Sequence, residues 1–213
     1  MKRQAPPAAE SSATPGAARS SEKYQRILDA AIAVIAENGY FNAPVSRIAE
    51  LAGVADGTVY LYFKNKEQIL MAAIEKALTT FLERARQELQ TVDDPKQRLR
   101  RLACLHFESL AANRELAVVL QIELRQSAKF LAEFSHRYLV EYFNLIRSII
   151  REGQERGVFR QDVSEKIAAN CYFGALDEMV TSWVLSEREY SLPAMADAVV
   201  DLLVRGMETR PDV

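Results

Sequence analysis

From Ser21 onward the chain carries apolar residues at helical spacing, and no stretch alternates in the manner of a half-buried strand. Ile27, Ala31 and Val34 begin this pattern on one helical face, and Gly39 follows as a residue suited to ending a helix. The sequence therefore predicts an all-α fold of about nine helices. The expected helices after the first cover residues 45–52, 57–62, 65–90, 95–112, 115–126, 128–156, 164–186 and 193–209.

Several classes of protein are excluded by what the chain lacks. No apolar run is long enough to span a membrane and no secretion signal opens the chain, so we expect a cytoplasmic protein with no membrane partner. Cys104 and Cys171 are interpreted as buried thiols in a reducing compartment. With two histidines and no nucleophile motif, metal-ligand spacing or phosphate-binding glycine loop, we expect no enzyme activity, no metal and no cofactor.

Residues 45–66, VSRIAELAGVADGTVYLYFKNK, form two short helical segments joined by a tight turn that contains glycine. This is the pattern of a DNA-binding helix-turn-helix, whose second helix enters the major groove. Asp56 is expected to cap that second helix. No acidic residue occurs from Gly57 to Lys66, which favours a DNA contact, although the net charge of −2 gives no general basic surplus.

The candidate DNA-binding residues divide by chemistry. Hydroxyl and cationic side chains suit phosphate contacts, and small, apolar or aromatic residues on the second helix suit base edges. The phosphate candidates are Ser46, Arg47, Thr58, Tyr62 and Lys66, and the base-edge candidates are Gly57, Val59 and Tyr60.

The motif G-V-x-x-G-T-x-Y-x-Y-F-x-x-K-E, from Gly53 to Glu67, resembles the signature of the TetR family of bacterial repressors. Residues 1–20 are rich in Pro, Ala and Ser with almost nothing to bury, which predicts a disordered tail. The resemblance implies a three-helix DNA-binding domain over 21–68, and a ligand-binding and dimerisation domain over 69–213. It also implies a homodimer on a palindromic double-stranded DNA operator. Ala43 departs from the family, in which many members place Ser or Thr there, so either Asn42 caps the next helix or that helix starts less firmly.

The stretch 173–185 is apolar around much of its circumference yet carries Asp177, Glu178 and Thr181. Such a helix is enclosed on several sides. We therefore expect it to face a pocket on one side and, together with the last helix, to form the homodimer interface on the other. The adjacent Asp177 and Glu178 diverge on a helix and cannot act as a facing carboxylate pair.

The segments 123–127, 152–153 and 173–178, with Trp183, are similar to the acyl-CoA-responsive repressors of fatty-acid degradation. This resemblance implies a long-chain acyl-CoA as the small-molecule effector, with its tail in an apolar tunnel and its phosphates near cations. Binding would tilt the 65–90 helix and spoil the fit of two recognition helices about 34–36 Å apart. The expected lining residues are Leu110, Leu120, Leu124, Tyr138, Tyr142, Phe173, Val180 and Trp183, and the expected polar contacts are His106, Arg125 and Arg147.

Other interpretations stay open at this level. His106 can be a satisfied interior histidine, and Arg125 can pair with Glu123. The same fold can respond to a different lipophilic ligand and control efflux or other genes. A helical adaptor that does not bind DNA is a third possibility.

Overall fold

The structure, a computed structural model, describes residues 15–126 and 139–209. The described residues form nine α-helices and one isolated β-bridge between Phe159 and Glu208, and no sheet, which confirms the all-α prediction. The α-helices are α1 (Pro15–Asn38), α2 (Val45–Ala52), α3 (Asp56–Tyr62), α4 (Lys66–Leu89), α5 (Pro95–Ala111), α6 (Arg114–Val118), α8 (Val140–Glu155), α9 (Glu165–Leu185) and α10 (Ala196–Met207). In the described part no helix is long and apolar enough to cross a membrane.

Side chains just before α4, α5, α6 and α9 cap these helices and fix where they begin. Asn65 accepts from the Gln68 backbone N–H at 2.9 Å at the start of α4, and Asn113 accepts from the Leu116 N–H at the start of α6. Asp94 caps α5, where Pro95 occupies the first turn. The sharp turn between α2 and α3 depends on Gly53, whose φ of 64° is left-handed.

The structure corrects the cap prediction for α3 and decides between the two alternatives left open for α2. The N-cap of α3 is Ala55, and Asp56 lies one residue later, inside the first turn, without a capping hydrogen bond. Its charge there favours the positive end of the helix dipole instead. The α2 N-cap is Pro44, also without a side-chain cap, and the Asn42 amide donates to the Asn38 carbonyl. Of the two alternatives, Asn42 does not cap α2, and the helix starts without side-chain support.

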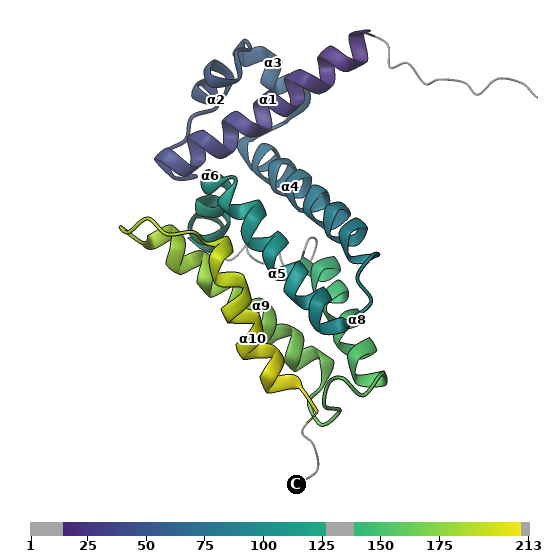
Figure 1. The fold of residues 1–213 in the computed structure, drawn as a ribbon. Coiled ribbons are helices and arrows are strands. Elements are labelled where there is room, and N and C mark those ends of the chain that lie inside the picture. Colours follow the sequence, from purple (N-terminus) through teal and green to yellow (C-terminus); the bar gives the residue numbers. More distant parts are fainter. Residues whose placement is uncertain (1–14, 127–138, 210–213) are drawn as a thin grey trace, which may run out of the picture.

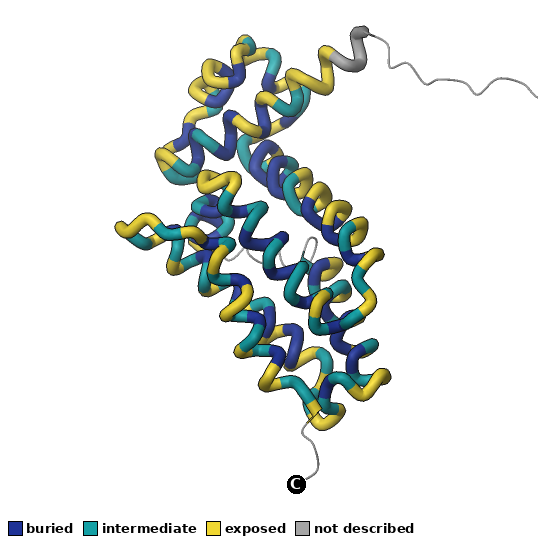
Figure 2. The backbone as a smooth tube through the Cα atoms, in the orientation of Figure 1, coloured by how far each residue is buried: buried dark blue, intermediate teal, exposed yellow. Residues whose placement is uncertain are grey.

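Two hydrophobic cores lie along the molecule, and α4 contributes to both. In Figure 1, α1, α2 and α3 gather at one end, and α4 runs from them alongside α5 toward α8. The first core packs Ile27, Ile48 and Val59 with the first half of α4 through Ile74. The second core packs the later half of α4 with α5, α8, α9 and α10. Buried positions follow the inner faces of these helices (Figure 2).

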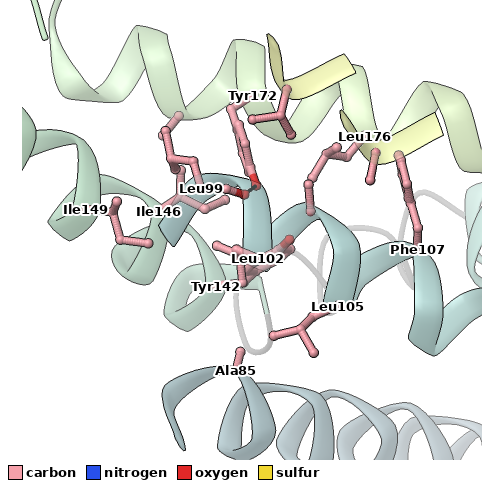
Figure 3. Packing of buried hydrophobic residues seen from close by; sticks show 14 of the residues in the cluster. Ala85, Leu99, Leu102, Leu105, Phe107, Tyr142, Ile146, Ile149, Tyr172 and Leu176 are labelled. Atoms are coloured by element: carbon pink, nitrogen blue, oxygen red, sulfur yellow. Dashed lines mark hydrogen bonds between the residues drawn. The ribbon is translucent and has the colours of Figure 1, made fainter. Parts of the chain in front are cut away.

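The second core is held by large side chains and by buried hydrogen bonds, one of which joins α9 to α5. Figure 3 shows Leu99 and Leu102 of α5 close to Tyr172 of α9. The Tyr172 hydroxyl donates to the Leu99 carbonyl at 2.6 Å, so this buried phenol is satisfied. These contacts fix α5 against α9, and both helices contribute polar groups to the cavity described below.

Several boundaries differ from the sequence expectation. The first helix starts at Pro15, inside the expected 1–20 tail, of which residues 1–14 lie outside the described residues. The first core runs through Ile74, so the expected boundary at 68 cuts through it. The expected 115–126 helix is α6 followed by a π-helical turn, Val119–Glu123, and a 3₁₀ turn, Leu124–Gln126. The start of the expected 128–156 helix lies outside the described residues, which resume before α8. The last helix opens with a 3₁₀ turn, Pro193–Met195.

Candidate functional site

The exposed face of α3 is the candidate DNA-reading surface. Tyr60 and Leu61 are 57% and 83% exposed, which is unusual for large apolar side chains. Gly57 is exposed with open space around its Cα, and Thr58 is partly exposed. Val59 is fully buried in the first core, so its predicted base contact is wrong. Leu61 was not among the predicted residues, although it follows Tyr60 directly.

The predicted phosphate contacts occupy different environments. Ser46 is exposed, and Arg47 forms an exposed ion pair with Glu50 at 2.8 Å that a phosphate can replace. The Tyr62 hydroxyl lies 3.0 Å from the Ser20 hydroxyl on α1, and its ring packs edge-on against Tyr24. Tyr62 therefore also braces the recognition helix against α1.

Lys66 has a structural role. Its ammonium donates to the carbonyls of Tyr40, Phe41 and Ala43 and lies 4.7 Å from the centre of the Tyr40 ring. Partial burial lowers the pKa of this ammonium. An ammonium has three N–H donors, and three carbonyls accept them here. Lys66 therefore stabilises the loop between α1 and α2, and its three N–H donors are used there rather than left for the phosphate contact that the sequence predicted.

A cavity of about 350 Å³ lies among α4, α5, α6, α8 and α9. Six residues expected around a ligand line it: His106, Leu110, Leu120, Arg125, Tyr142 and Phe173. Nine further residues complete the lining: Ile74, Ala77, Leu78, Phe81, Ser109, Leu116, Gln121, Leu139 and Asp177. Ile74, Leu78 and Phe81 have the i, i+4, i+7 spacing of one helical face, which was a usable signal in the sequence.

Four other expected ligand residues, all within the described part of the chain, do not line this cavity. Leu124 is buried in the first core and Val180 in the second. The Trp183 indole N–H donates to the Tyr190 carbonyl, and the Arg114 guanidinium lies 4.6 Å from its ring centre. Arg147 lies over the Phe143 ring. Helical spacing gave the apolar character of these positions but not the direction they face. Tyr138 lies outside the described residues.

One end of the cavity is polar. Arg125 donates to Asp177 at 2.5 Å and to the Gln121 side-chain oxygen at 2.6 Å. The Gln121 amide donates to Asp177, and the Thr181 hydroxyl lies 2.9 Å from the Gln121 oxygen. Arg125 therefore pairs with Asp177 rather than with Glu123, the partner considered from the sequence. Because the Arg125 side chain is 42% exposed, this network lies at the edge of the cavity.

His106 lies deeper, among aromatic rings. Its Nδ1 is 3.1 Å from the Tyr142 hydroxyl, and its Nε2 is buried with no hydrogen-bond partner among the described residues. Burial lowers the pKa of His106 from 6.5 to about 4, so the ring is neutral near pH 7. Burial also raises the pKa of the Tyr142 hydroxyl well above its usual value. Of the two ring nitrogens of this interior histidine, Nδ1 therefore has a hydrogen-bond partner and Nε2 has none among the described residues.

The cavity wall also contacts the DNA-reading end of the protein, the part formed by α1, α2 and α3. Val119 and Leu124, from the π and 3₁₀ turns, are buried in the first core, whereas Leu120 and Gln121 line the cavity. The Glu123 carboxylate, 9% exposed, accepts from the Tyr40 backbone N–H at 2.8 Å. Gly39, the residue before Tyr40, has a left-handed φ of 77°, a conformation that favours glycine, and the Glu123 carboxylate lies in ordinary contact distance of it. One short segment therefore contacts both sites.

The outer face of α9 and α10 carries exposed apolar side chains. Ile167 and Leu185 of α9 are more than half exposed, and Leu202 of α10 is 76% exposed. Cys171 lies on the same stripe of α9 and is exposed, which corrects the expectation of a buried thiol, whereas Cys104 is partly buried. The described residues hold no cluster of metal-ligating side chains.

Comparisons with known proteins agree with both parts of this arrangement. Residues 27–73 match the family model "Bacterial regulatory proteins, tetR family", and residues 74–206 match "YsiA-like protein, C-terminal region". A fatty acid metabolism regulator protein of Bacillus subtilis is 41% identical over 88% of this chain and 97% of its own length.

Two solved structures share this fold closely. The fatty acid degradation regulator FadR from Bacillus halodurans has 42% identity and a TM-score of 0.83, over 88% of this chain and 97% of that one. FadR from Bacillus subtilis, solved in complex with stearoyl-CoA, has 41% identity and a TM-score of 0.82, over 87% of this chain and all of that one.

Proposed function

Because the chain belongs to the TetR family of bacterial regulators, we propose that it is a cytoplasmic transcriptional repressor, not an enzyme, released from DNA by a long-chain acyl-CoA. It binds a palindromic operator as a homodimer and controls genes of fatty-acid degradation. The observation that carries this proposal is the cavity, which is mostly apolar inside, has the Arg125–Asp177 ion pair at its edge and is joined by one short segment to the DNA-reading end.

The cavity fits the two chemical parts of an acyl-CoA. Ile74, Leu78 and Phe81 of α4 offer apolar surface to an acyl chain. Arg125 can give up its exposed pairing with Asp177 to meet a phosphate of the coenzyme. The volume of about 350 Å³ is at the lower end of ligand sites, which span about 300–1,000 Å³, so a long chain has to push the walls apart.

Wall movement provides the link to DNA. The π turn carries Leu120 into the cavity wall, and Glu123 at its end binds the Tyr40 N–H. Residue 40 belongs to the loop that Lys66 holds beside α2. An acyl chain that displaces this wall therefore shifts the helix-turn-helix relative to the second core. In a dimer such a shift changes the spacing of the two recognition helices.

The central experiment measures operator binding with and without ligand. A duplex selected from random sequences by the full-length protein supplies the operator. Oleoyl-CoA is expected to weaken operator binding about 5–150-fold, the usual range of allosteric coupling, while free oleate and free CoA have little effect. No change with any long-chain acyl-CoA would sink the acyl-CoA proposal but leave the DNA-binding role intact.

Chain length gives a second readout from the same material. Each further buried methylene is worth about 0.8 kcal/mol, or about fourfold in affinity, until the cavity is full. Saturated acyl-CoAs of increasing length should therefore bind with rising affinity and then reach a plateau in calorimetric titrations. A flat series would indicate that the acyl chain stays outside the cavity.

A further inference from the structure

The inner part of the cavity contains a polar atom that an unbranched alkyl chain cannot satisfy. His106 lines the cavity and is 9% exposed, and its Nε2 is shielded from solvent without a partner in the described part of the chain. The edges of Phe81 and Phe173 pack around this imidazole, with ring centres 6.1 and 6.4 Å away. A buried polar group without a partner is destabilising, so its retention among aromatic rings requires a reason.

The hydrogen bond to Tyr142 indicates which nitrogen carries the proton. If Nδ1 donated to the phenol oxygen, the phenol O–H and the Nε2 lone pair would both be unpaired. If the phenol donates to Nδ1 instead, only the Nε2–H is unpaired. The second arrangement leaves fewer groups unsatisfied and suits the neutral ring, in which one nitrogen donates and the other accepts. His106 therefore offers an N–H donor.

We infer that the Nε2–H of His106 donates to an oxygen on the acyl part of the ligand, and so selects effectors that carry an acceptor there. The inference rests on the proposed function. Two oxygens have this chemistry: the thioester carbonyl, or a hydroxyl or keto group along the chain. In either case the ligand oxygen accepts a hydrogen bond from the His106 Nε2–H, which has no other partner among the described residues. A plain alkyl chain at that point leaves the N–H without an acceptor.

Three ligands of equal chain length distinguish these oxygens in calorimetric titrations of the full-length protein. They are palmitoyl-CoA, its thioether analogue hexadecyl-CoA, which lacks the carbonyl, and 3-hydroxypalmitoyl-CoA. If the carbonyl is the acceptor, palmitoyl-CoA binds about tenfold or more tighter than hexadecyl-CoA. If a chain oxygen is the acceptor, the hydroxylated ligand binds tighter than palmitoyl-CoA by a similar factor. Equal affinity for all three overturns the inference.

Variants assign the preference to His106. His106→Phe keeps an aromatic ring among Phe81 and Phe173 but removes the donor, and is expected to abolish the preference. His106→Gln keeps an N–H donor at similar reach and is expected to retain part of it. Ser109→Ala, one turn along α5 in the same cavity lining, is the matched control and is expected to preserve the preference. A preference that survives His106→Phe, or that Ser109→Ala abolishes instead, contradicts the inference.

A spectroscopic measurement needs no variant that must tolerate a change in the core. The sequence contains two histidines, so ¹⁵N-histidine labelling gives a simple spectrum, and His136→Gln, at the other histidine, assigns the His106 signals by elimination. Saturation with the preferred ligand should shift the Nε2–H proton downfield, as a newly formed hydrogen bond does. An unchanged signal at saturation would overturn the inference. Failure of every acyl-CoA to bind would instead overturn the effector part of the proposed function, on which this inference rests.

Discussion

On α3, two apolar side chains that are close in sequence differ completely in burial. Val59 is fully buried and Leu61, two positions later, is 83% exposed. Both are apolar, so hydrophobicity alone could not tell them apart, and the sequence-based choice of Val59 was wrong. The distinction depends on which face of α3 packs against α2 and α1, which no local pattern contains. Thymine methyl groups in the major groove provide an apolar partner for an exposed leucine.

Leu61→Ala is expected to lower specific operator affinity, by up to about tenfold, and to relax the preference for A·T at one position of each half-site. Affinity for unrelated duplex DNA, which depends on phosphate contacts, should hardly change. Fluorescence anisotropy with single base-pair variants of the operator measures both effects. Equal losses on operator and unrelated DNA would show that Leu61 does not read sequence.

Lys66→Met is expected to destabilise the protein by about 1–3 kcal/mol, because three carbonyls of the α1–α2 loop lose their donor. Lys64→Met, at an exposed lysine two positions earlier, is the matched control and should change stability by less than about 0.5 kcal/mol. Urea unfolding measures both. A phosphate contact by Lys66 would show differently: the slope of log affinity against log salt would fall by about 0.9 in Lys66→Met.

The lowered pKa of His106 predicts a loss of stability in acid. As the pH falls below about 6.5 the unfolded chain binds a proton that the folded protein excludes until about pH 4. Stability should therefore decrease between these values, by up to about 1.4 kcal/mol per pH unit. In His106→Gln, which cannot titrate, this part of the pH dependence should disappear from urea-unfolding curves. An identical slope in both proteins would place the imidazole in contact with water.

At the scale of elements, the segment after α6 departs most from what periodicity predicts. Leu116, Leu120 and Leu124 are spaced for one α-helix, and a single 115–126 helix was expected. The structure has a π turn at Val119–Glu123, where the backbone bonds reach one residue further. Apolar spacing cannot distinguish these bonding patterns over one turn. The longer helices α4, α5 and α9 were predicted to within two residues at each end because their apolar faces extend over several turns and side-chain caps precede them.

Glu123→Ala is expected to reduce the effect of ligand on DNA binding, because it removes the hydrogen bond from the cavity wall to the Tyr40 N–H. Residues on such a connection typically modulate coupling by about 0.5–2 kcal/mol, so the ligand-induced change in operator affinity should shrink about 2–30-fold. Glu123→Gln keeps an acceptor oxygen and serves as the control that should retain most of the coupling. An unchanged ratio of operator affinities in Glu123→Ala would exclude this route.

For the whole molecule, the exposed stripe on α9 and α10 supports the homodimer through the last two helices. Ile167, Leu185 and Leu202 leave apolar surface uncovered in a single chain, and a two-fold axis through the two helices would bury the same patch on both copies. The sequence pointed to these helices because 173–185 is apolar around most of its surface. It did not predict that α4 belongs to both cores, since that depends on where distant helices pack.

Leu202→Arg is expected to weaken or abolish the dimer, because it places a charge at a 76% exposed apolar position on α10. Val140→Arg, at an exposed apolar position of α8 outside this stripe, is the matched control and should remain dimeric. Light scattering coupled to size-exclusion chromatography gives the mass of each species. Operator affinity should fall together with dimerisation, since each half-site then binds alone. A dimeric Leu202→Arg protein would place the interface elsewhere.

Helix α4 is continuous from the loop beside the recognition helix to Leu89, and Ile74 in its middle belongs to the first core while it also lines the cavity. Within α4, the helix that belongs to both hydrophobic cores, no irregular linker separates the first core from the second. A protease needs extended chain to cleave, so limited digestion should not release the DNA-reading end as an intact fragment. The protein should behave as one body toward proteases, and a ligand held far from the recognition helix should protect that helix from digestion as well.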